Sequence, residues 1–168
     1  DITWQLYHQL KPRLAAEAMS SLYYRLDKPM IAVIAKMEQR GILVSRSVLS
    51  ALSEEFAQRL AALESDIHHQ AGENFNVGSP KQLGDILFEK LGLAGSERGK
   101  NGAWSTSADI LEKLHDAHPI IPMILKWRAL AKLKSTYSDA LPLQISPRDQ
   151  RVHTSFALAL TNTGRLSS

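Results

Sequence analysis

The chain has 168 residues, of which 44% are hydrophobic and 22% charged, and its formal net charge is +3 at pH 7. This length is enough for one ordinary domain with parts of its neighbours, and no apolar run approaches the roughly 18 residues that a membrane helix needs. The chain contains no cysteine, which excludes disulfides and thiolate metal sites and makes the cytoplasm the default compartment.

The first 44 residues predict two helices and a short extended piece. Because the chain starts at Asp1 without an initiator Met or the layout of a signal peptide, we expect it to begin inside a longer protein. One apolar stripe indicates a helix over residues 2–26. A second helix is predicted to begin at Asp27, with Pro29 in its first turn, and to end at Gly41. An extended piece over residues 42–44 follows.

A long helix with one narrow apolar seam is predicted next. Ser45 is a candidate N-cap, and Gly72 is placed to end the helix. Such a seam needs a partner helix. Its apolar residues recur at spacings of three and four: Leu49, Leu52, Phe56, Leu60, Leu63 and Ile67.

Shorter elements follow. Ser79 and Gln82 have the spacing of a capping box, which predicts a short helix that closes at Gly92. Residues 92–105 hold several glycines without periodicity and indicate a mobile surface loop. Residues 106–109 are predicted to cap another short helix.

The last strong helix is predicted over residues 119–137. It carries four basic residues, with no acidic residue between Asp116 and Asp139: Lys126, Arg128, Lys132 and Lys134. After Pro142 the helical period is lost, and residues 151–156 are rich in strand formers. The predicted fold is mainly α: a long antiparallel helical hairpin with short tip helices and a small β remnant at the C-terminus.

The basic helix is the first candidate binding surface. Arg128 and Lys132 lie one turn apart on one face, so they can meet successive phosphates of a nucleic-acid backbone. The alternative is a solvated helix face whose lysine stems cover apolar neighbours. Trp127 beside them fits packing better than base stacking.

Neutral donors and a glycine loop add weaker signals for phosphate. Asn76, Ser79 and the hydroxyls of residues 105–107 (Ser105, Thr106 and Ser107) lie at helix starts, where backbone N–H groups and the helix dipole suit an anion. Lys100 in the glycine-rich loop belongs to either a surface connector or a flexible tip that touches DNA. This loop lacks the spacing of a P-loop.

Catalytic alternatives find little support. The sequence has no serine elbow, zinc-protease helix or dinucleotide fingerprint. The histidines show no known metal-ligand spacing: His68, His69, His115, His118 and His153. We expect no complete active site within this chain.

Several motifs resemble family A DNA polymerases of the bacterial DNA polymerase I type. They occur in that family's order and spacing: Phe75-Asn-Val, Lys81-Gln-Leu, Ile86-Leu-Phe-Glu, Ser105-Thr-Ser, Leu130-Ala-Lys-Leu-Lys-Ser-Thr-Tyr137 and Thr163-Gly-Arg-Leu-Ser-Ser168. The resemblance covers essentially the whole chain. In that family the first metal-binding aspartate comes shortly after the last motif, so we expect a fragment that grips DNA without catalysing synthesis.

The resemblance implies how the chain is organised. Residues 1–27 would be the closing helix of a 3′–5′ exonuclease-like domain with a linker, 28–44 a palm-side helix, 45–145 the thumb, and 146–168 the start of the palm. Arg165 would reach the minor-groove edge near the primer terminus. The implied DNA-binding residues are Asn76, Ser79, Lys100, Ser105, Thr106, Ser107, Arg128, Lys132, Ser135 and Arg165.

The resemblance also implies a function for the parent protein. This is template-directed DNA synthesis in replication and repair, with two Mg²⁺ ions and deoxynucleoside triphosphates in the complete enzyme. The chain itself would bind primer–template duplex as a monomer at the bacterial nucleoid, hold no metal or membrane site, and be inactive alone. The alternative is a self-contained helical module that binds another protein.

Overall fold

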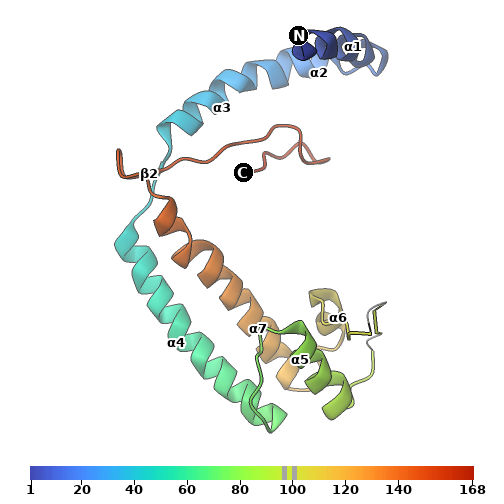
Figure 1. Cartoon of the computed structure of the whole chain (residues 1–168), viewed down its shortest axis with the longest axis vertical. Coiled ribbons are helices and arrows are strands. Elements are labelled where there is room, and N and C mark those ends of the chain that lie inside the picture. The colour runs from blue at the N-terminus through green and yellow to red at the C-terminus, as the bar shows by residue number, and fades with distance from the viewer. Residues whose placement is uncertain (96–97, 100–101) are drawn as a thin grey trace. The chain divides into compact units, whose positions relative to one another are not determined.

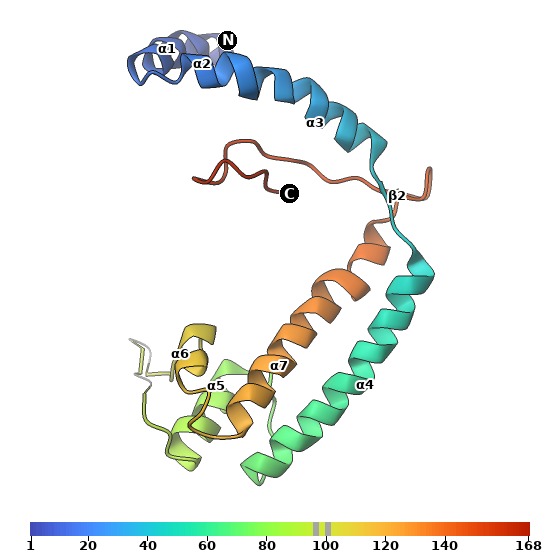
Figure 2. The same cartoon turned by 180° about the vertical axis from the view of Figure 1, so that it is seen from behind.

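The computed structural model describes residues 1–95, 98–99 and 102–168, and it is mainly helical, as predicted (Figures 1 and 2). Its contacts divide the chain into two compact units. We call Ser45–Leu143 the hairpin unit, and Asp1–Val44 with Gln144–Ser168 the flanking unit. Among the described residues, no helix has the length and apolar character to cross a membrane.

The hairpin unit begins with the long helix α4 (Arg46–Ala71). The Ser45 hydroxyl accepts a hydrogen bond from the Val48 N–H at 3.4 Å and so caps one of the unpaired donors of the first turn. At the other end Gly72 adopts a left-handed conformation with φ +73°, which a residue without a side chain tolerates best. Both predicted ends of this helix are confirmed.

The partner that the apolar seam of α4 needs is α7 (Ile120–Leu133), which continues as the wide helical turn η3 (Lys134–Asp139). The two helical segments lie side by side in both views (Figures 1 and 2). Near the start of α4, the Ser53 hydroxyl donates to Asp139 at 2.6 Å, and Lys134 donates to the same carboxylate at 2.8 Å. The helices are therefore antiparallel and joined by a polar tie at their open end.

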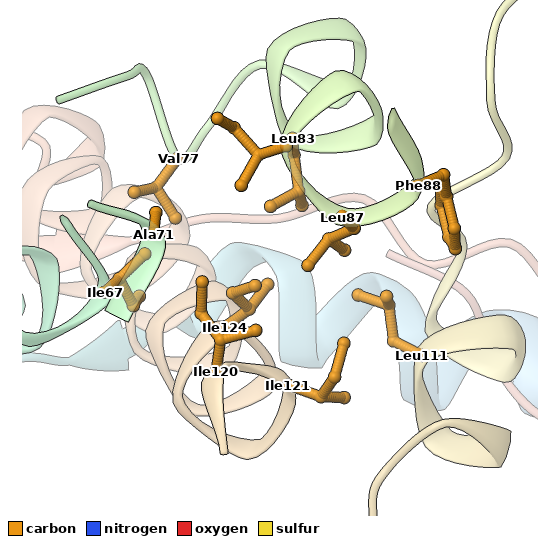
Figure 3. Close-up of a cluster of buried hydrophobic side chains, with 11 residues drawn as sticks. Ile67, Ala71, Val77, Leu83, Leu87, Phe88, Leu111, Ile120, Ile121 and Ile124 are labelled. Atoms are coloured by element: carbon orange, nitrogen blue, oxygen red, sulfur yellow. The ribbon is translucent and has the colours of Figure 1, made fainter. Parts of the chain in front are cut away.

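The core of the hairpin unit lies at its closed end. Three short elements that lie between α4 and α7 in the sequence pack there against the start of α7: α5 (Pro80–Gly84), the wide turn η2 (Asp85–Lys90) and α6 (Ala108–Lys113). Figure 3 shows their side chains pointing toward one another. The buried cluster consists of Ile67, Ala71, Val77, Leu83, Ile86, Leu87, Phe88, Leu111, Ile120, Ile121 and Ile124.

The helices of the flanking unit break earlier than predicted. The chain leaves the helical path at residues 17–19, where Ala18 has φ +57°, and is then helical as far as Arg40. As expected, a helix begins after Asp27 with Pro29 in its first turn, but Asp27 makes no capping side-chain hydrogen bond and a wide π-turn leads into this helix without a break. The elements are α1 (Ile2–Ala16), α2 (Ser20–Leu22), η1 (Tyr23–Asp27) and α3 (Lys28–Arg40).

The C-terminal segment returns to the end of α3. Strand β2 (Arg151–Val152) pairs antiparallel with β1 (Ile42–Leu43), and Ile42 lies opposite Val152. The strand is shorter than the stretch of strand formers suggested. Before the pair, the single 3₁₀ turn η4 (Leu141–Gln144) ends the helical region. After it, Ala157 and Ser167 form an isolated bridge.

Candidate nucleic-acid interface

Two consecutive residues of α7 hold the closed end of the hairpin unit in place. Trp127 and Arg128 leave the helix about 100° apart, because an α-helix has about 3.6 residues per turn. Each side chain therefore contacts a different segment of the tip. These two segments carry half of the residues that the sequence predicted to bind DNA: Asn76, Ser79, Ser105, Thr106 and Ser107.

Arg128 holds the segment before α6. One guanidinium nitrogen donates to the Thr106 carbonyl oxygen, and the other donates to the Thr106 hydroxyl at 3.1 Å. Thr106 is buried, with 6% of its surface exposed. Burial lowers the pKa of Arg128, but a guanidinium stays charged at neutral pH. This contact could not be predicted from the sequence, since a pair separated by 22 residues leaves no periodic signal.

Ser105 and Ser107 flank Thr106 and so share its anchorage. Ser107 is exposed and forms the N-cap position of α6, whereas Ser105 is half-buried. The predicted serine and threonine residues are thus brought next to Arg128.

Trp127 packs on the turn before α5. A Cβ atom added to Gly78 would lie 3.4 Å from the edge of the Trp127 ring, which is an ordinary contact distance, so the ring lies against this turn. The Asn76 side-chain oxygen accepts from the Gly78 N–H at 2.9 Å, which closes a compact turn. The expectation that Trp127 packs is confirmed. Its ring N–H is buried and has no hydrogen-bond partner within the described part of the chain.

The predicted capping box at Ser79 is half right. The Ser79 hydroxyl accepts from the Gln82 N–H at 3.4 Å, as an N-cap does. The Gln82 side chain does not return to the Ser79 N–H, because that group already donates to the Asn76 carbonyl at 2.9 Å. Gln82 instead accepts from the Asn76 N–H at 2.7 Å. Asn76 and Ser79 are therefore fixed relative to each other.

The glycine-rich loop has more structure than predicted. Arg98 and Trp104 form an isolated bridge, and the Arg98 guanidinium stacks over the Trp104 ring at 4.7 Å. Both side chains also bond to Glu89, Arg98 at 2.6 Å and the Trp104 ring N–H at 3.2 Å. This fixes Trp104 against η2. Lys100 lies outside the residues that the structure describes.

Further along α7, Lys132 is exposed one turn after Arg128 on the same face. Ser135 is also exposed, and its hydroxyl donates to the Lys132 carbonyl at 3.3 Å. Lys134 is paired with Asp139, so the apparent excess of basic charge on this helix is smaller than the sequence suggested. The remaining basic face is formed by Arg128 and Lys132.

Arg165 belongs to the flanking unit. It is exposed in a loop where Gly164 has φ +73°, and its carbonyl accepts from the Thr161 hydroxyl at 2.8 Å. The remaining predicted site residues with described positions lie in the hairpin unit. Among the described residues, no three His, Asp or Glu side chains gather as a metal site would need.

Comparison with known proteins identifies the family. The family model described as DNA polymerase family A matches residues 46–168. The chain belongs to DNA polymerase family A. DNA polymerase I of Rhizobium leguminosarum is 56% identical over 100% of this chain, which corresponds to 17% of that protein. The thermostable DNA polymerase I of Thermus aquaticus is 46% identical over 98% of this chain and 20% of its own length.

A solved structure supports the same assignment. The polymerase domain of Pol1 from M. smegmatis, in complex with DNA primer–template and dNTP, matches with a TM-score of 0.78 and 35% identity. The match covers 95% of this chain and 28% of that one. The chain thus spans less than a third of the length of these family A relatives.

Proposed function

We propose that the hairpin unit is the DNA-binding thumb of a bacterial-type DNA polymerase I. The observation that carries this proposal is the family A match over residues 46–168, on a long helical hairpin similar to a polymerase domain solved with primer–template. In this proposal residues 1–27 close an exonuclease-like domain, 28–44 form a palm-side helix, 45–145 the thumb, and 146–168 begin the palm.

The thumb would grip duplex DNA by its backbone. Arg128 and Lys132 supply positive charge one turn apart. The two segments anchored on α7, around Ser79 and around Thr106, supply hydroxyls at fixed positions. Lys100 and Ser135 would add flanking contacts. Such contacts hold the register of a duplex and read no sequence.

Catalysis belongs to the complete enzyme in this proposal. The donor set of the described residues does not fit a metal pair, so we assign no metal-dependent step to this chain. The complete polymerase would use two Mg²⁺ ions and deoxynucleoside triphosphates for template-directed synthesis in replication and repair. It would act as a monomer at the bacterial nucleoid.

Binding of a fluorescent primer–template by the 168-residue chain tests the thumb. With about two to four phosphate contacts, we expect a log–log salt slope of roughly −2 to −4 and no sequence preference. Lys132→Ala should reduce the slope by about one. The matched control is Lys126→Ala, because this lysine of the same helix lies beside Asp66 in a groove against α4. Equal effects of the two variants would contradict the proposed face.

Kinetics of the complete polymerase distinguish residues that hold the DNA from residues that align the primer end. Arg128→Ala should raise the DNA dissociation rate, since it removes one cation and releases Thr106. Arg165→Ala should slow incorporation on bound DNA and reduce the penalty for extending a mismatched primer end. The 168-residue chain alone should give no primer extension with Mg²⁺ and all four nucleotides. The assignment is backwards if Arg165→Ala changes only dissociation and Arg128→Ala only the chemical rate.

A further inference from the structure

A polar junction joins the end of α3 to the C-terminal segment. His153 places its Nδ1 atom 2.7 Å from the Glu38 carbonyl oxygen and its Nε2 atom 2.8 Å from the Asp149 carboxylate. Since both partners are acceptors, both ring nitrogens must donate, which requires the charged imidazolium. The bond to the Glu38 carbonyl and then the bond to the Asp149 side chain raise the pKa of His153, against the smaller opposing effects of desolvation and of Arg148.

Glu38 binds the returning segment a second time. Its side-chain oxygen accepts a hydrogen bond from the Phe156 N–H at 2.6 Å. One residue of α3 therefore holds two positions of the segment, one through its backbone and one through its carboxylate. Asp149 completes the junction by accepting from the Arg151 N–H at 3.2 Å.

Gly41 makes this junction sterically possible. A Cβ atom at this position would lie 2.8 Å from the His153 ring and 2.9 Å from the Val152 carbonyl oxygen. Its φ of +62° and ψ of −177° fall in a region that glycine alone adopts readily. The ring of His153 therefore lies directly on the turn between α3 and β1.

The loop that carries Arg165 starts immediately after the junction. Ala157 and Ser167 exchange backbone hydrogen bonds of 2.8 and 3.1 Å, which close the loop at its base beside Phe156. Apolar residues of this loop are not buried: Leu160 is 72% and Leu166 37% exposed, and Leu158 is only half-buried. The position of the loop in the flanking unit therefore depends on the polar attachment at Glu38 and His153.

We propose that Glu38 and His153 are positioning residues that fix the Arg165 loop to the end of α3. This inference rests on the role proposed for Arg165 at the primer end. Neither residue touches DNA in the proposal. Their effect on polymerisation passes through the placement of Arg165.

The test uses the complete polymerase and single-turnover incorporation on bound DNA. Glu38→Ala and His153→Phe should each slow incorporation about three- to tenfold, the scale of one lost hydrogen bond, and change the DNA dissociation rate less than about twofold. Glu38→Gln keeps the acceptor for the Phe156 N–H and should restore the rate. Glu17→Ala is the control, since this exposed glutamate of the same unit pairs with Arg13 at the end of α1.

A double-variant comparison decides between positioning and a general structural effect. In an Arg165→Ala background, Glu38→Ala should slow incorporation by less than about twofold, because the group that it positions is already absent. Full additivity of the two changes would overturn the inference, and so would a Glu38→Gln variant as slow as Glu38→Ala.

Hydrogen exchange of the Phe156 and Ala157 amides in the 168-residue chain tests the attachment of the loop separately from the role proposed for Arg165. Glu38→Ala should accelerate this exchange at least tenfold, while Glu38→Gln should not, and His153→Asn is a milder alternative if His153→Phe does not fold. Unchanged exchange in Glu38→Ala contradicts the attachment itself. Normal incorporation by Arg165→Ala, with accelerated exchange in Glu38→Ala, instead refutes the role proposed for Arg165.

Discussion

The two units of the chain keep their shape by different means. The hairpin unit has its own core at the closed end, where Leu83, Leu87 and Ile124 are fully buried. The flanking unit buries only Ile34 and Ile145 among the hydrophobic residues described for it. Most of its large apolar side chains are exposed: Ile2, Trp4, Leu6, Tyr7, Leu10, Met19, Leu22, Tyr24, Leu26, Ile31, Val33, Met37, Ile42, Leu43, Leu160 and Leu166.

This difference indicates a division between apolar packing and polar attachment. Side-chain burial provides most of the free energy of folding, so the hairpin unit has what it needs for independent stability. In the flanking unit the contacts between distant parts of the chain are mainly hydrogen bonds at Glu38 and His153 and a two-residue strand pair. Such contacts fix geometry more than they add net stability.

The largest expected effect comes from the core. Leu87→Ala should lower the free energy of unfolding of the hairpin unit by about 2–5 kcal/mol, because it leaves a cavity among packed side chains. Ile31→Ala in the flanking unit, where the side chain is 56% exposed, should change stability by less than about 0.5 kcal/mol. Urea unfolding followed by tryptophan fluorescence in a Trp4→Phe background measures the hairpin unit through Trp104 and Trp127, and amide exchange at Ile34 measures the flanking unit. Similar costs for the two variants would remove the contrast between the units.

Gly41 in the flanking unit and Gly72 in the hairpin unit both have positive φ, so substitutions at these positions compare the two units. Gly41→Ala should destabilise the β1–β2 junction by about 1–3 kcal/mol through backbone strain, and further because its Cβ would meet the Val152 carbonyl oxygen. Gly72→Ala should cost about 1–2 kcal/mol, since the left-handed region is accessible to alanine and the nearest atom, the Lys90 ammonium nitrogen, lies at an ordinary contact distance of 3.8 Å. Amide exchange at Val152 and at Ala71 in the two variants provides the measurement. A larger loss for Gly72→Ala would contradict this ranking.

The smallest expected effects are those of pH, and they differ between the units. Hydrogen bonds from Lys134 and Ser53 lower the pKa of Asp139, so the tie of the hairpin unit is present above the unfolded pKa and is lost as pH falls through the folded pKa. The pKa of His153 is raised, so its contribution is full below about 6.5 and is lost as pH rises through the higher folded pKa. The bond to His153 lowers the pKa of Asp149. The stability that Asp149 contributes to the flanking unit is therefore lost at acid pH, as pH falls through its folded pKa.

Mild alkali should therefore loosen the flanking unit and leave the hairpin unit unchanged. Amide exchange of the 168-residue chain between pH 6 and 9, corrected for the intrinsic rate, should show loss of protection at Phe156 but not at Asp139. His153→Asn should abolish this pH dependence. Parallel loss of protection in both units would show that the two polar ties are not independent.

The sequence predicted the elements that depend on local rules. The seam from Leu49 to Ile67, the cap at Ser45 and the stop at Gly72 were all readable, because spacing and end residues determine them. The break between α1 and α2 was missed, since the apolar pattern continues past residues 17–19 and nothing in the sequence marks the positive φ of Ala18. The contact partners of Arg128 and His153 could not be predicted, because they lie 22 and 115 residues away in the sequence.

The flanking unit is formed by two stretches of chain separated by the whole hairpin unit. Its contacts between Glu38 and the C-terminal segment close loops of 115 and 118 residues, and closing a long loop costs chain entropy. Contacts within the hairpin unit join residues that are closer in the sequence, such as Ser53 and Asp139, which are 86 residues apart. Once Ser53 and Asp139 are joined, most of the longer loop is already closed. We therefore expect the hairpin to form first during folding, and the strand pair to follow as a late step whose rate depends on the hairpin.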